Sequence, residues 1–226
     1  KEHEYVMLVD VSKGRGQDYS TFNVIDISSR PFKQVAVYRN NLISPLLFPN
    51  IIYKWAVSYN RAYVVIESND QGSLVTNGLY NDLEYENMHV ESAIKANALG
   101  IEMTRKVKRL GCSAFKDILE NNKLEVCDDD TILEISTFVA KGVSYEASPG
   151  NHDDLVMNLV LLGFFISTQY FSDMTDINLK EMMFKQKMKE IEDDLPPFGF
   201  IDDGLPTNHQ KEEEGVPWAI EYLPDI

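Results

Sequence analysis

The stretch Val6–Ser28, VMLVDVSKGRGQDYSTFNVIDIS, decides the fold class because it places two strand-like segments around a polar, Gly-containing loop. The first segment ends on a carboxylate, Asp10, and the loop carries a second one, Asp18. Aspartate is rare in strands and costly to bury unless it is paired, hydrogen-bonded or bound to a metal. The position of Asp10 therefore needs a chemical reason.

The remaining sequence extends this start into an α/β pattern of strands and helices. Segments with β-branched and aromatic residues between polar breaks are expected to be strands at 5–9, 20–27, 32–38, 62–66 and 142–148. Segments with helical apolar spacing or helix-start signals are expected to be helices from Pro49 onward and at 72–83, 104–122, 129–139 and 152–171. Asn151 is expected to cap the last of these helices.

Composition indicates one main domain. The chain has 226 residues and is 44% hydrophobic, enough to bury a core, so we expect a core at 1–175 followed by a C-terminal helix and acidic tail at 176–226. No apolar run is long enough to cross a bilayer. Cys112 and Cys127 form no zinc or disulfide motif, which favours a reducing cytosol. The chain begins without Met or a signal peptide, which suggests a fragment of a longer polypeptide.

The acids that follow two strands and open one helix form the candidate site. Asp10 ends the first strand, Glu67 ends the strand at 62–66, and Asp153 and Asp154 lie in the first turn of the last helix. If the first and fourth strands are parallel neighbours, these carboxylates meet at one sheet edge. Clustered carboxylates repel one another, and hard oxygen ligands favour Mg²⁺ or Mn²⁺. Asp10 and Asp18 also suit turns, and Asp153 and Asp154 also suit a helix dipole, whereas Glu67 has little local reason to end a buried strand. His152 suits either a polar loop or support of a ligand.

Charge gives a mixed signal about nucleic acid. The formal net charge of −15 argues against it, but basic residues are concentrated at 105–109, RKVKR, and at Lys116. On a helix, Arg105, Lys108 and Arg109 share one face, whereas Lys106 points elsewhere. This face either contacts DNA phosphates or is an ordinary solvated surface.

Four motifs, VMLVDVSKGRGQDYS, AYVVIESND, TRKVKRLGCSAFKDILE and HDDLVMNLVL, resemble the nuclease domain of the large terminase subunit of tailed bacteriophages, most closely T-even-like ones. The resemblance covers most of the chain. It implies an RNase H-like fold of the RuvC/integrase type, with a mixed central sheet flanked by helices. It also implies a metal-dependent endonuclease that cuts concatemeric viral double-stranded DNA when genome packaging starts and ends.

The same resemblance implies the residue roles and partners. Asp10, Glu67 and Asp154 match the catalytic metal-binding acids, Asp18 matches a further acid of the first loop, and Asp153 is the competing member of the pair. Two Mg²⁺ ions, replaceable by Mn²⁺, are expected. The expected partners are an N-terminal packaging ATPase in the same polypeptide, the phage portal and the small terminase subunit, all in the host bacterial cytoplasm.

Rival functions make different demands on the sequence. No GxxxxGK[ST] motif occurs, so P-loop ATP hydrolysis is not expected from this chain. An actin-like ATPase or sugar kinase would need a second phosphate loop and a Gly-Gly adenosine motif, and neither is found. A catalytically inactive RNase H-like module that docks DNA or protein stays an alternative, although such a module has no use for carboxylates that repel phosphate.

Overall fold

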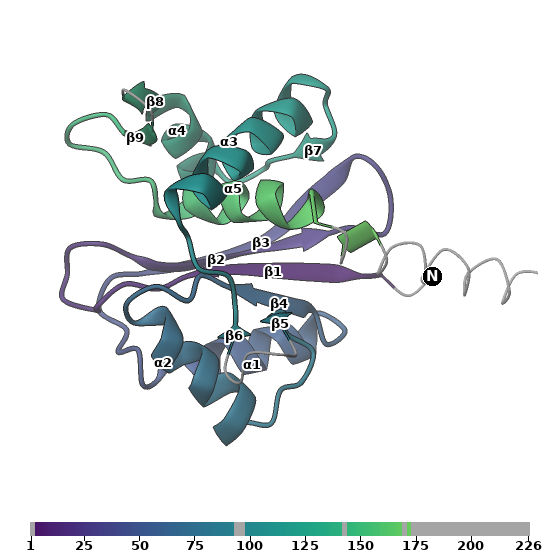
Figure 1. The fold of residues 1–226 in the computed structure, drawn as a ribbon, viewed down its shortest axis with the longest axis vertical. Coiled ribbons are helices and arrows are strands. Elements are labelled where there is room, and N and C mark those ends of the chain that lie inside the picture. The colour runs from purple at the N-terminus through teal and green to yellow at the C-terminus, as the bar shows by residue number, and fades with distance from the viewer. Residues whose placement is uncertain (1–2, 93–97, 142–143, 169–170, 173–226) are drawn as a thin grey trace, which may run out of the picture. The chain divides into compact units, whose positions relative to one another are not determined.

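A five-stranded mixed sheet forms the centre of the computed structural model, which describes residues 3–92, 98–141, 144–168 and 171–172 (Figure 1). The strands lie in the order β4-β1-β2-β3-β7. Their bounds are β1 Tyr5–Asp10, β2 Ser20–Asp26, β3 Phe32–Asn40, β4 Tyr63–Ile66 and β7 Leu124–Glu125. β2 is antiparallel to β1 and β3, whereas β4 is parallel to β1 and β7 is parallel to β3.

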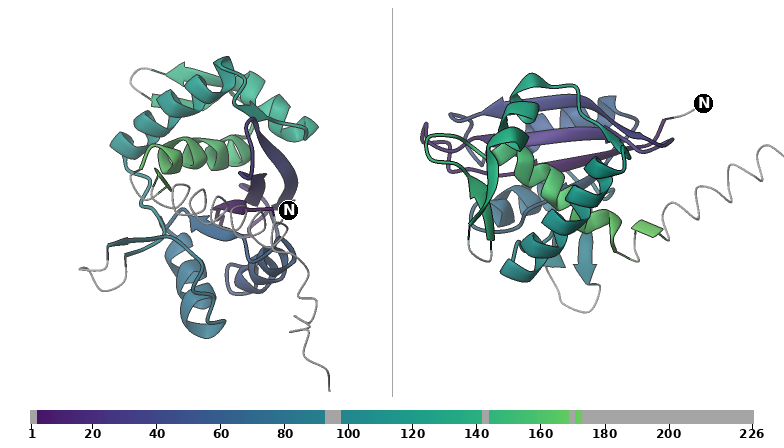
Figure 2. Two further views of the ribbon diagram at one scale, coloured as in Figure 1. Left: turned by 90° about the vertical axis from the view of Figure 1, so that its right-hand side faces the viewer. Right: turned by 90° about the horizontal axis from the view of Figure 1, so that it is seen from above.

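Helices cover both faces of this sheet. Their bounds are α1 Phe48–Ser58, α2 Gly72–Asn77, α3 Arg105–Glu120, α4 Asp129–Thr137 and α5 Asp154–Ile166. α1 and α2 lie on one face, and α3, α4 and α5 lie on the other, with α5 between the sheet and α3 (Figures 1 and 2). The predicted α/β class, with a mixed sheet flanked by helices, is confirmed.

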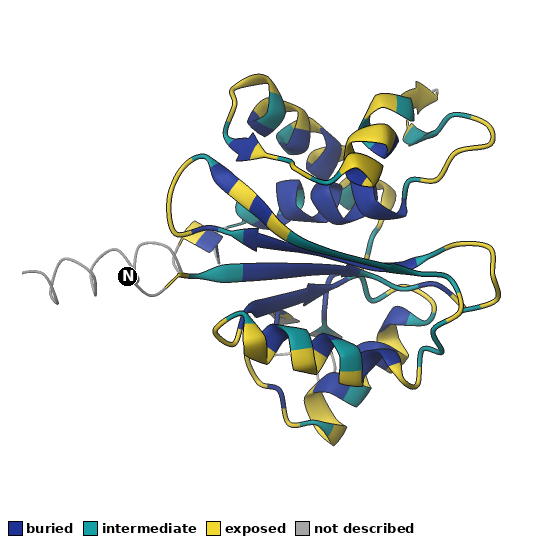
Figure 3. Ribbon diagram, turned by 180° about the vertical axis from the view of Figure 1, so that it is seen from behind, coloured by how far each residue is buried: buried dark blue, intermediate teal, exposed yellow. Residues whose placement is uncertain are grey.

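Alternation along β1 explains the two-sided core. Val6 and Leu8 pack with α3 and α5, whereas Met7 and Val9 pack with α1 and α2. Since strands buried on both faces need apolar residues at every position, the unbroken runs VMLV and YVVI are the expected sequences for β1 and β4. The burial pattern is visible in Figure 3, where the central strands and α5 are buried and the outer sides of the helices are exposed.

Short elements connect the main ones. A π-helical turn, Gly78–Asp82, follows α2, so the expected helix at 72–83 is present in two pieces. β5 Val90–Ser92 pairs with β6 Ala98–Leu99, and β8 Phe138–Lys141 forms a hairpin with β9 Ser144–Ala147. No helix within these described parts of the chain has both the length and the apolar character needed to cross a bilayer.

Most expected elements are confirmed, and one helix start is not. α1 begins at Phe48 with Pro49 in its first turn, as predicted. The prediction that Asn151 caps α5 is wrong, because the capping position is Asp153. Asn151 instead donates its side-chain amide to the Ser148 carbonyl and hydroxyl oxygens, at 3.3 and 3.0 Å. The expected C-terminal helix and tail, 176–226, lie outside the described residues and stay a prediction.

Two glycines set the distance between α3 and α5. A Cβ on Gly111 of α3 would lie 2.4 Å from the Val160 carbonyl oxygen of α5. A Cβ on Gly163 of α5 would lie 2.5 Å from the Gly111 carbonyl oxygen. Because these contacts involve backbone atoms on both helices, any larger residue must push the helices apart.

Gly111→Ala is therefore expected to lower the free energy of unfolding by about 1–3 kcal/mol, the usual range for overpacking. Urea unfolding followed by circular dichroism measures this loss. Ala114→Gly, on the same helix but less buried, is the control and should cost only about 1 kcal/mol through helix propensity. A free energy of unfolding that is unchanged or higher in Gly111→Ala would contradict the close helix contact.

Candidate active site

Asp10 and Glu67 are neighbours because their strands are parallel. Asp10 is the last residue of β1, and Glu67 directly follows β4. Val9 is opposite Ile66 in the register, and the Glu67 amide donates a hydrogen bond to the Val9 carbonyl oxygen at 2.9 Å. The carboxyl ends of parallel strands emerge at one sheet edge, so both acids project from the same edge, as the sequence predicted.

The start of α5 brings Asp154 to this edge. Thr21 of β2 is paired with Asp10 in the register, and its hydroxyl donates to the Asp154 carbonyl oxygen at 3.1 Å. The side-chain amide of Asn158, one turn further along α5, donates to the Thr21 hydroxyl oxygen at 2.9 Å. α5 is thereby fixed across β2, one strand away from Asp10.

These three acids line one open pocket of about 410 Å³. Two further carboxylates, Asp18 from the β1–β2 loop and Asp70 from the loop after β4, complete its acidic wall. The other lining residues are Val11, Ser12, Lys13, Arg15, Gln17, Tyr19 and Asn69. The predicted constellation of Asp10, Glu67, Asp154 and Asp18 is thus brought together in space.

Electrostatics inside this pocket oppose full ionisation. Burial, then Glu67 and Asp154, raise the pKa of Asp10 well above its usual value. Burial raises the pKa of Glu67 to about 7, although the nearby Lys108 ammonium opposes the rise. Burial also raises the pKa of Asp154 to about 6, against a hydrogen bond from the Tyr19 backbone amide. The folded protein therefore holds protons here that an unfolded chain releases.

The donor set fits a hard divalent cation. The acids offer only oxygen atoms, and Asp154 Oδ2 is buried without a hydrogen-bond partner among the described residues. His152 Nδ1 lies 3.7 Å from that oxygen. No three His, Cys, Asp or Glu side chains in the described part of the chain are yet close enough to hold one ion. Binding would thus require the carboxylates to turn inward.

The two members of the Asp153–Asp154 pair have different surroundings. Asp154 is buried and lines the pocket, whereas Asp153 is absent from the lining and accepts a hydrogen bond from the Ala147 amide at 3.3 Å. This placement favours Asp154 as the ligand. His152 is exposed, and its ring packs perpendicular to the ring of Tyr19, with the two ring centroids 5.1 Å apart. Because Tyr19 lines the pocket, His152 lies at the border of the site.

The predicted basic residues lie on α3, outside the pocket lining. Lys108 is half-buried and close enough to Glu67 to affect its pKa, and its ammonium lies 5.8 Å from the Phe138 ring centroid. Arg105, Lys106 and Arg109 are exposed. Lys116 pairs with Glu120 at 3.6 Å and lies eight residues, or about 12 Å along the helix, beyond Lys108. Within this basic cluster, Lys108 is the residue for which the structure shows an effect on one of the acids, Glu67.

Lys13 and Arg15 supply positive charge in the pocket itself, and neither was predicted from the sequence. They flank Gly14, whose φ of +66° and approach to the Ile43 carbonyl leave no room for a Cβ. The signal was present in SKGRGQD, where two basic residues alternate with glycines next to Asp10. It was outweighed by the stronger run at 105–109.

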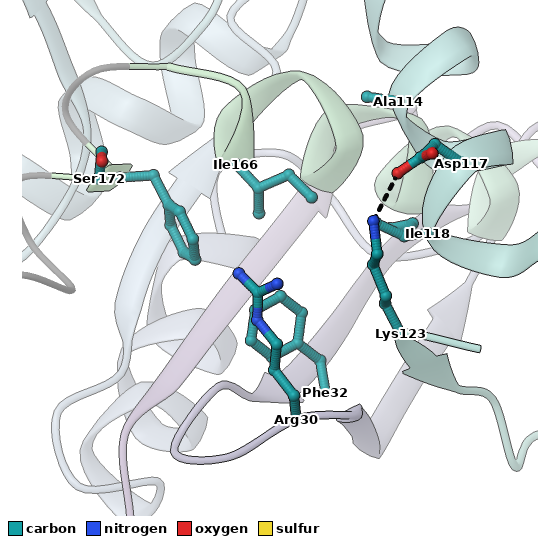
Figure 4. A pocket seen from close by; sticks show the side chains of 9 residues that line it. Arg30, Phe32, Ala114, Asp117, Ile118, Lys123, Ile166 and Ser172 are labelled. Atoms are coloured by element: carbon teal, nitrogen blue, oxygen red, sulfur yellow. Dashed lines mark hydrogen bonds and ion pairs between the residues drawn. The ribbon is translucent and has the colours of Figure 1, made fainter. Parts of the chain in front are cut away.

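A second pocket, of about 310 Å³, has different chemistry (Figure 4). It lies between β3, α3 and the end of α5, with Arg30 stacked 5.5 Å from the Phe32 ring centroid. Its one carboxylate, Asp117, is already paired with Lys123 at 2.8 Å. This pocket has no acid cluster for a metal.

The raised pKa values predict how the metal-free protein responds to pH. A Glu67 pKa near 7 in the fold and near 4.3 when unfolded means that stability falls as pH rises between these values. In EDTA, Glu67→Gln should raise the melting temperature more at pH 8 than at pH 5, by several degrees, since about 1 kcal/mol corresponds to roughly 2–4 °C. Glu86→Gln, an exposed acid outside the pocket lining, should show no such difference. If Glu67→Gln raised the melting temperature equally at both pH values, the raised pKa of Glu67 would be refuted.

Comparison with known proteins identifies the fold. The chain matches the nuclease of the large terminase from thermophilic phage G20c with bound magnesium, with 24% identity, a TM-score of 0.58 and coverage of 72% of this chain and 81% of that one. It matches the Thermus phage P74-26 large terminase nuclease domain with 23% identity, a TM-score of 0.55 and coverage of 70% and 77%.

A more distant match is the Mn-soaked terminase nuclease domain of human cytomegalovirus, with 10% identity, a TM-score of 0.52 and coverage of 75% and 86%. These likenesses confirm the RNase H-like fold that the motif resemblance implied. The family model described as the terminase RNaseH-like domain matches residues 7–162, which include Asp10 and most of β1, all of β4 and the start of α5. This chain therefore belongs to the terminase RNaseH-like domain family.

Proposed function

We propose that this chain is a Mg²⁺- or Mn²⁺-dependent endonuclease that cuts concatemeric viral double-stranded DNA at the start and end of genome packaging. The observation that carries the proposal is the convergence of Asp10, Glu67 and Asp154 on one pocket, in a chain of the terminase family. That family supports a nuclease role in DNA packaging. The G20c nuclease with bound magnesium, cobalt or zinc and the Mn-soaked cytomegalovirus domain support a divalent metal, and the all-oxygen donor set favours Mg²⁺ or Mn²⁺ among these.

Charge in the pocket favours two ions over one. Five carboxylates against Lys13 and Arg15 give the fully ionised lining a formal charge of −3. One divalent ion leaves −1, which still repels a phosphodiester, whereas two leave +1, which attracts it. Two ions would activate a water and stabilise the leaving oxygen of an in-line displacement.

Each acid has a separate part in this proposal. Asp10 and Glu67 would bind the metal from the ends of two sheet strands, β1 and β4. Asp154 would bind it from the start of α5. Asp18 and Asp153 are weaker candidates for ligands, because Asp18 is exposed and Asp153 is outside the lining. His152 would support Asp154, whose Oδ2 it approaches.

DNA would be held by two groups of basic residues. Lys13 and Arg15 contact phosphates at the pocket, and Arg105, Lys106, Lys108 and Arg109 on α3 contact the backbone beside it. Lys116, further along α3, would contact the DNA backbone at the greatest distance from the pocket. The packaging ATPase, the portal and the small terminase subunit would be its partners in the host cytoplasm, with ATP hydrolysis left to the ATPase.

Amide variants test the catalytic acids. Asp10→Asn, Glu67→Gln and Asp154→Asn should each reduce Mg²⁺-dependent plasmid cleavage at least a hundredfold with an unchanged circular dichroism spectrum, because each removes a ligand charge and little volume. Asp153→Asn is the matched control, since it changes the adjacent acid outside the pocket, and it should retain most activity. Near-normal cutting by the Asp10→Asn or Asp154→Asn protein would defeat the proposal.

The metal requirement is tested with the unaltered chain. Plasmid cleavage should occur without ATP in Mg²⁺ or Mn²⁺, stop in EDTA, and be poor in Ca²⁺, whose longer and looser coordination positions the reacting oxygens less well. A docking module without catalysis would leave the plasmid intact in all four conditions. Equal cleavage rates in Ca²⁺ and Mg²⁺ would rule out the two-ion arrangement.

DNA contacts are tested by Arg105→Ala combined with Arg109→Ala. The double variant should bind DNA more weakly, with the slope of log affinity against log salt reduced by up to roughly 0.9 for each lost phosphate contact. Its Mn²⁺ affinity should stay unchanged, because neither residue lines the pocket. Lys54→Ala, on α1 across the sheet, is the control. DNA affinity equal to that of the wild type at low salt would place the DNA path elsewhere.

A further inference from the structure

Glu134 is a buried carboxylate outside the acidic pocket that contacts the start of α5. It lies on α4 and is only 4% exposed. Its Oε2 accepts hydrogen bonds from the Leu155 amide at 2.7 Å and the Val156 amide at 3.2 Å. These are the two residues that follow Asp154, so Glu134 holds the helix turn that carries a proposed metal ligand.

The start of α5 depends on this contact because it has no cap of its own. The first amides of a helix lack partners within the helix and need an acceptor from elsewhere. Asp153, at the capping position, makes no side-chain capping bond and accepts instead from Ala147. Glu134 supplies the missing acceptor from another helix, and its negative charge also suits the positive end of the α5 dipole.

Arg39 of β3 holds Glu134 in place from the other side. Its Nη2 lies 3.3 Å from Glu134 Oε1, and its Nη1 lies 3.3 Å from Asp130 Oδ2. The guanidinium also lies 4.0 Å from the centroid of the Tyr19 ring. Tyr19 lines the pocket, and its backbone amide hydrogen-bonds to Asp154.

The contacts form a closed path from the pocket to α4 and back. Asp154 is joined to Tyr19, Tyr19 to Arg39, Arg39 to Glu134, and Glu134 to the two amides after Asp154. On the sheet side, the Thr21 hydroxyl accepts a hydrogen bond from the Asn158 side-chain amide and donates one to the Asp154 carbonyl oxygen. These contacts fix the backbone at the start of α5, and the Asp154 Oδ2 atom itself stays without a hydrogen-bond partner among the described residues.

We propose that Glu134, held by Arg39, is a positioning residue that aims Asp154 into the metal site. This inference rests on the proposed nuclease function. Glu134 is not itself a ligand in this assignment, because it is absent from the pocket lining and its Oε2 is already committed to two amides. Losing it frees the first turn of α5 and lets the Asp154 carboxylate turn away from Asp10 and Glu67.

The test compares Glu134→Ala, Glu134→Gln and the control Asp130→Asn in the 226-residue chain. Asp130 pairs with the same arginine from the same helix, but it is exposed and the structure gives it no contact with α5 among the described residues. Three quantities are measured: hydrogen exchange of the Leu155 and Val156 amides, Mn²⁺ affinity by calorimetry, and kcat and KM for plasmid cleavage.

Glu134→Ala should speed exchange of both amides, weaken Mn²⁺ binding about tenfold or more, and lower kcat while KM for DNA stays near the wild-type value. Glu134→Gln should fall between wild type and Glu134→Ala, because its amide oxygen can still accept both hydrogen bonds while its NH₂ group faces Arg39. Asp130→Asn should match the wild type in all three measurements.

Wild-type exchange and Mn²⁺ affinity in a folded Glu134→Ala protein would overturn the positioning role. So would an equal loss in Asp130→Asn. If Glu134→Ala does not fold, Glu134→Gln decides, and unchanged exchange and Mn²⁺ affinity in that variant overturn the inference. A wild-type chain that binds no Mn²⁺ overturns the proposed function instead, which separates the two failures.

Discussion

Mutual repulsion among carboxylates is the constraint on which this structure depends. Asp10, Glu67 and Asp154 share a partly buried pocket, where burial and neighbouring charges raise the pKa of Asp10 well above its usual value. Left to themselves, such groups would turn into solvent or protonate. The surrounding elements must therefore hold the acids together at a cost in stability. Backbone pairing of β1 with β4 fixes two of them, and helix packing fixes the third.

A buried polar network connects these two kinds of support. The Asn23 amide donates to the Leu155 carbonyl oxygen at 3.1 Å, and Gln34 donates to Asn23 at 2.9 Å and to Thr131 at 3.1 Å. β2, β3, α4 and α5 are thus joined through side chains as well as apolar contacts. Buried polar groups give little net stability when satisfied, but they are costly when unpaired, so they favour one register of α5 on the sheet. That register determines where Asp154 lies.

The sequence was sufficient where a local pattern and its structural result coincide. Apolar runs that end on Asp10 and Glu67 predicted both the strands and the shared sheet edge, because parallel neighbours end on the same side. The start of α5 was harder. Asn151 matched the usual capping signal, whereas the acceptor for the first α5 amides is Glu134, a residue of another helix.

Long-range contacts of this kind have no local signature. In the sequence DDTILEIST, Glu134 has the pattern of an ordinary polar residue of a helix, and no neighbouring residue indicates that its side chain is only 4% exposed. Lys13 and Arg15 were not predicted for a different reason, since two isolated basic residues in a loop form no basic run. Which charges surround the acids depends on how the β1–β2 loop folds back, and composition does not specify that.

The placement of charge also resolves the conflict between an acidic chain and a nucleic-acid substrate. At physiological salt, exposed charges separated by more than about 8 Å are largely screened, so the total of −15 says little about the pocket. The charge near a phosphate in the pocket is the sum of the charges of five acids, Lys13 and Arg15. Without metal that balance is repulsive, and with two divalent ions it is attractive. Under the proposed function, metal binding therefore both creates the catalytic chemistry and opens the pocket to DNA, while Lys108 on α3, by lowering the pKa of Glu67, keeps that acid readier to bind the ion.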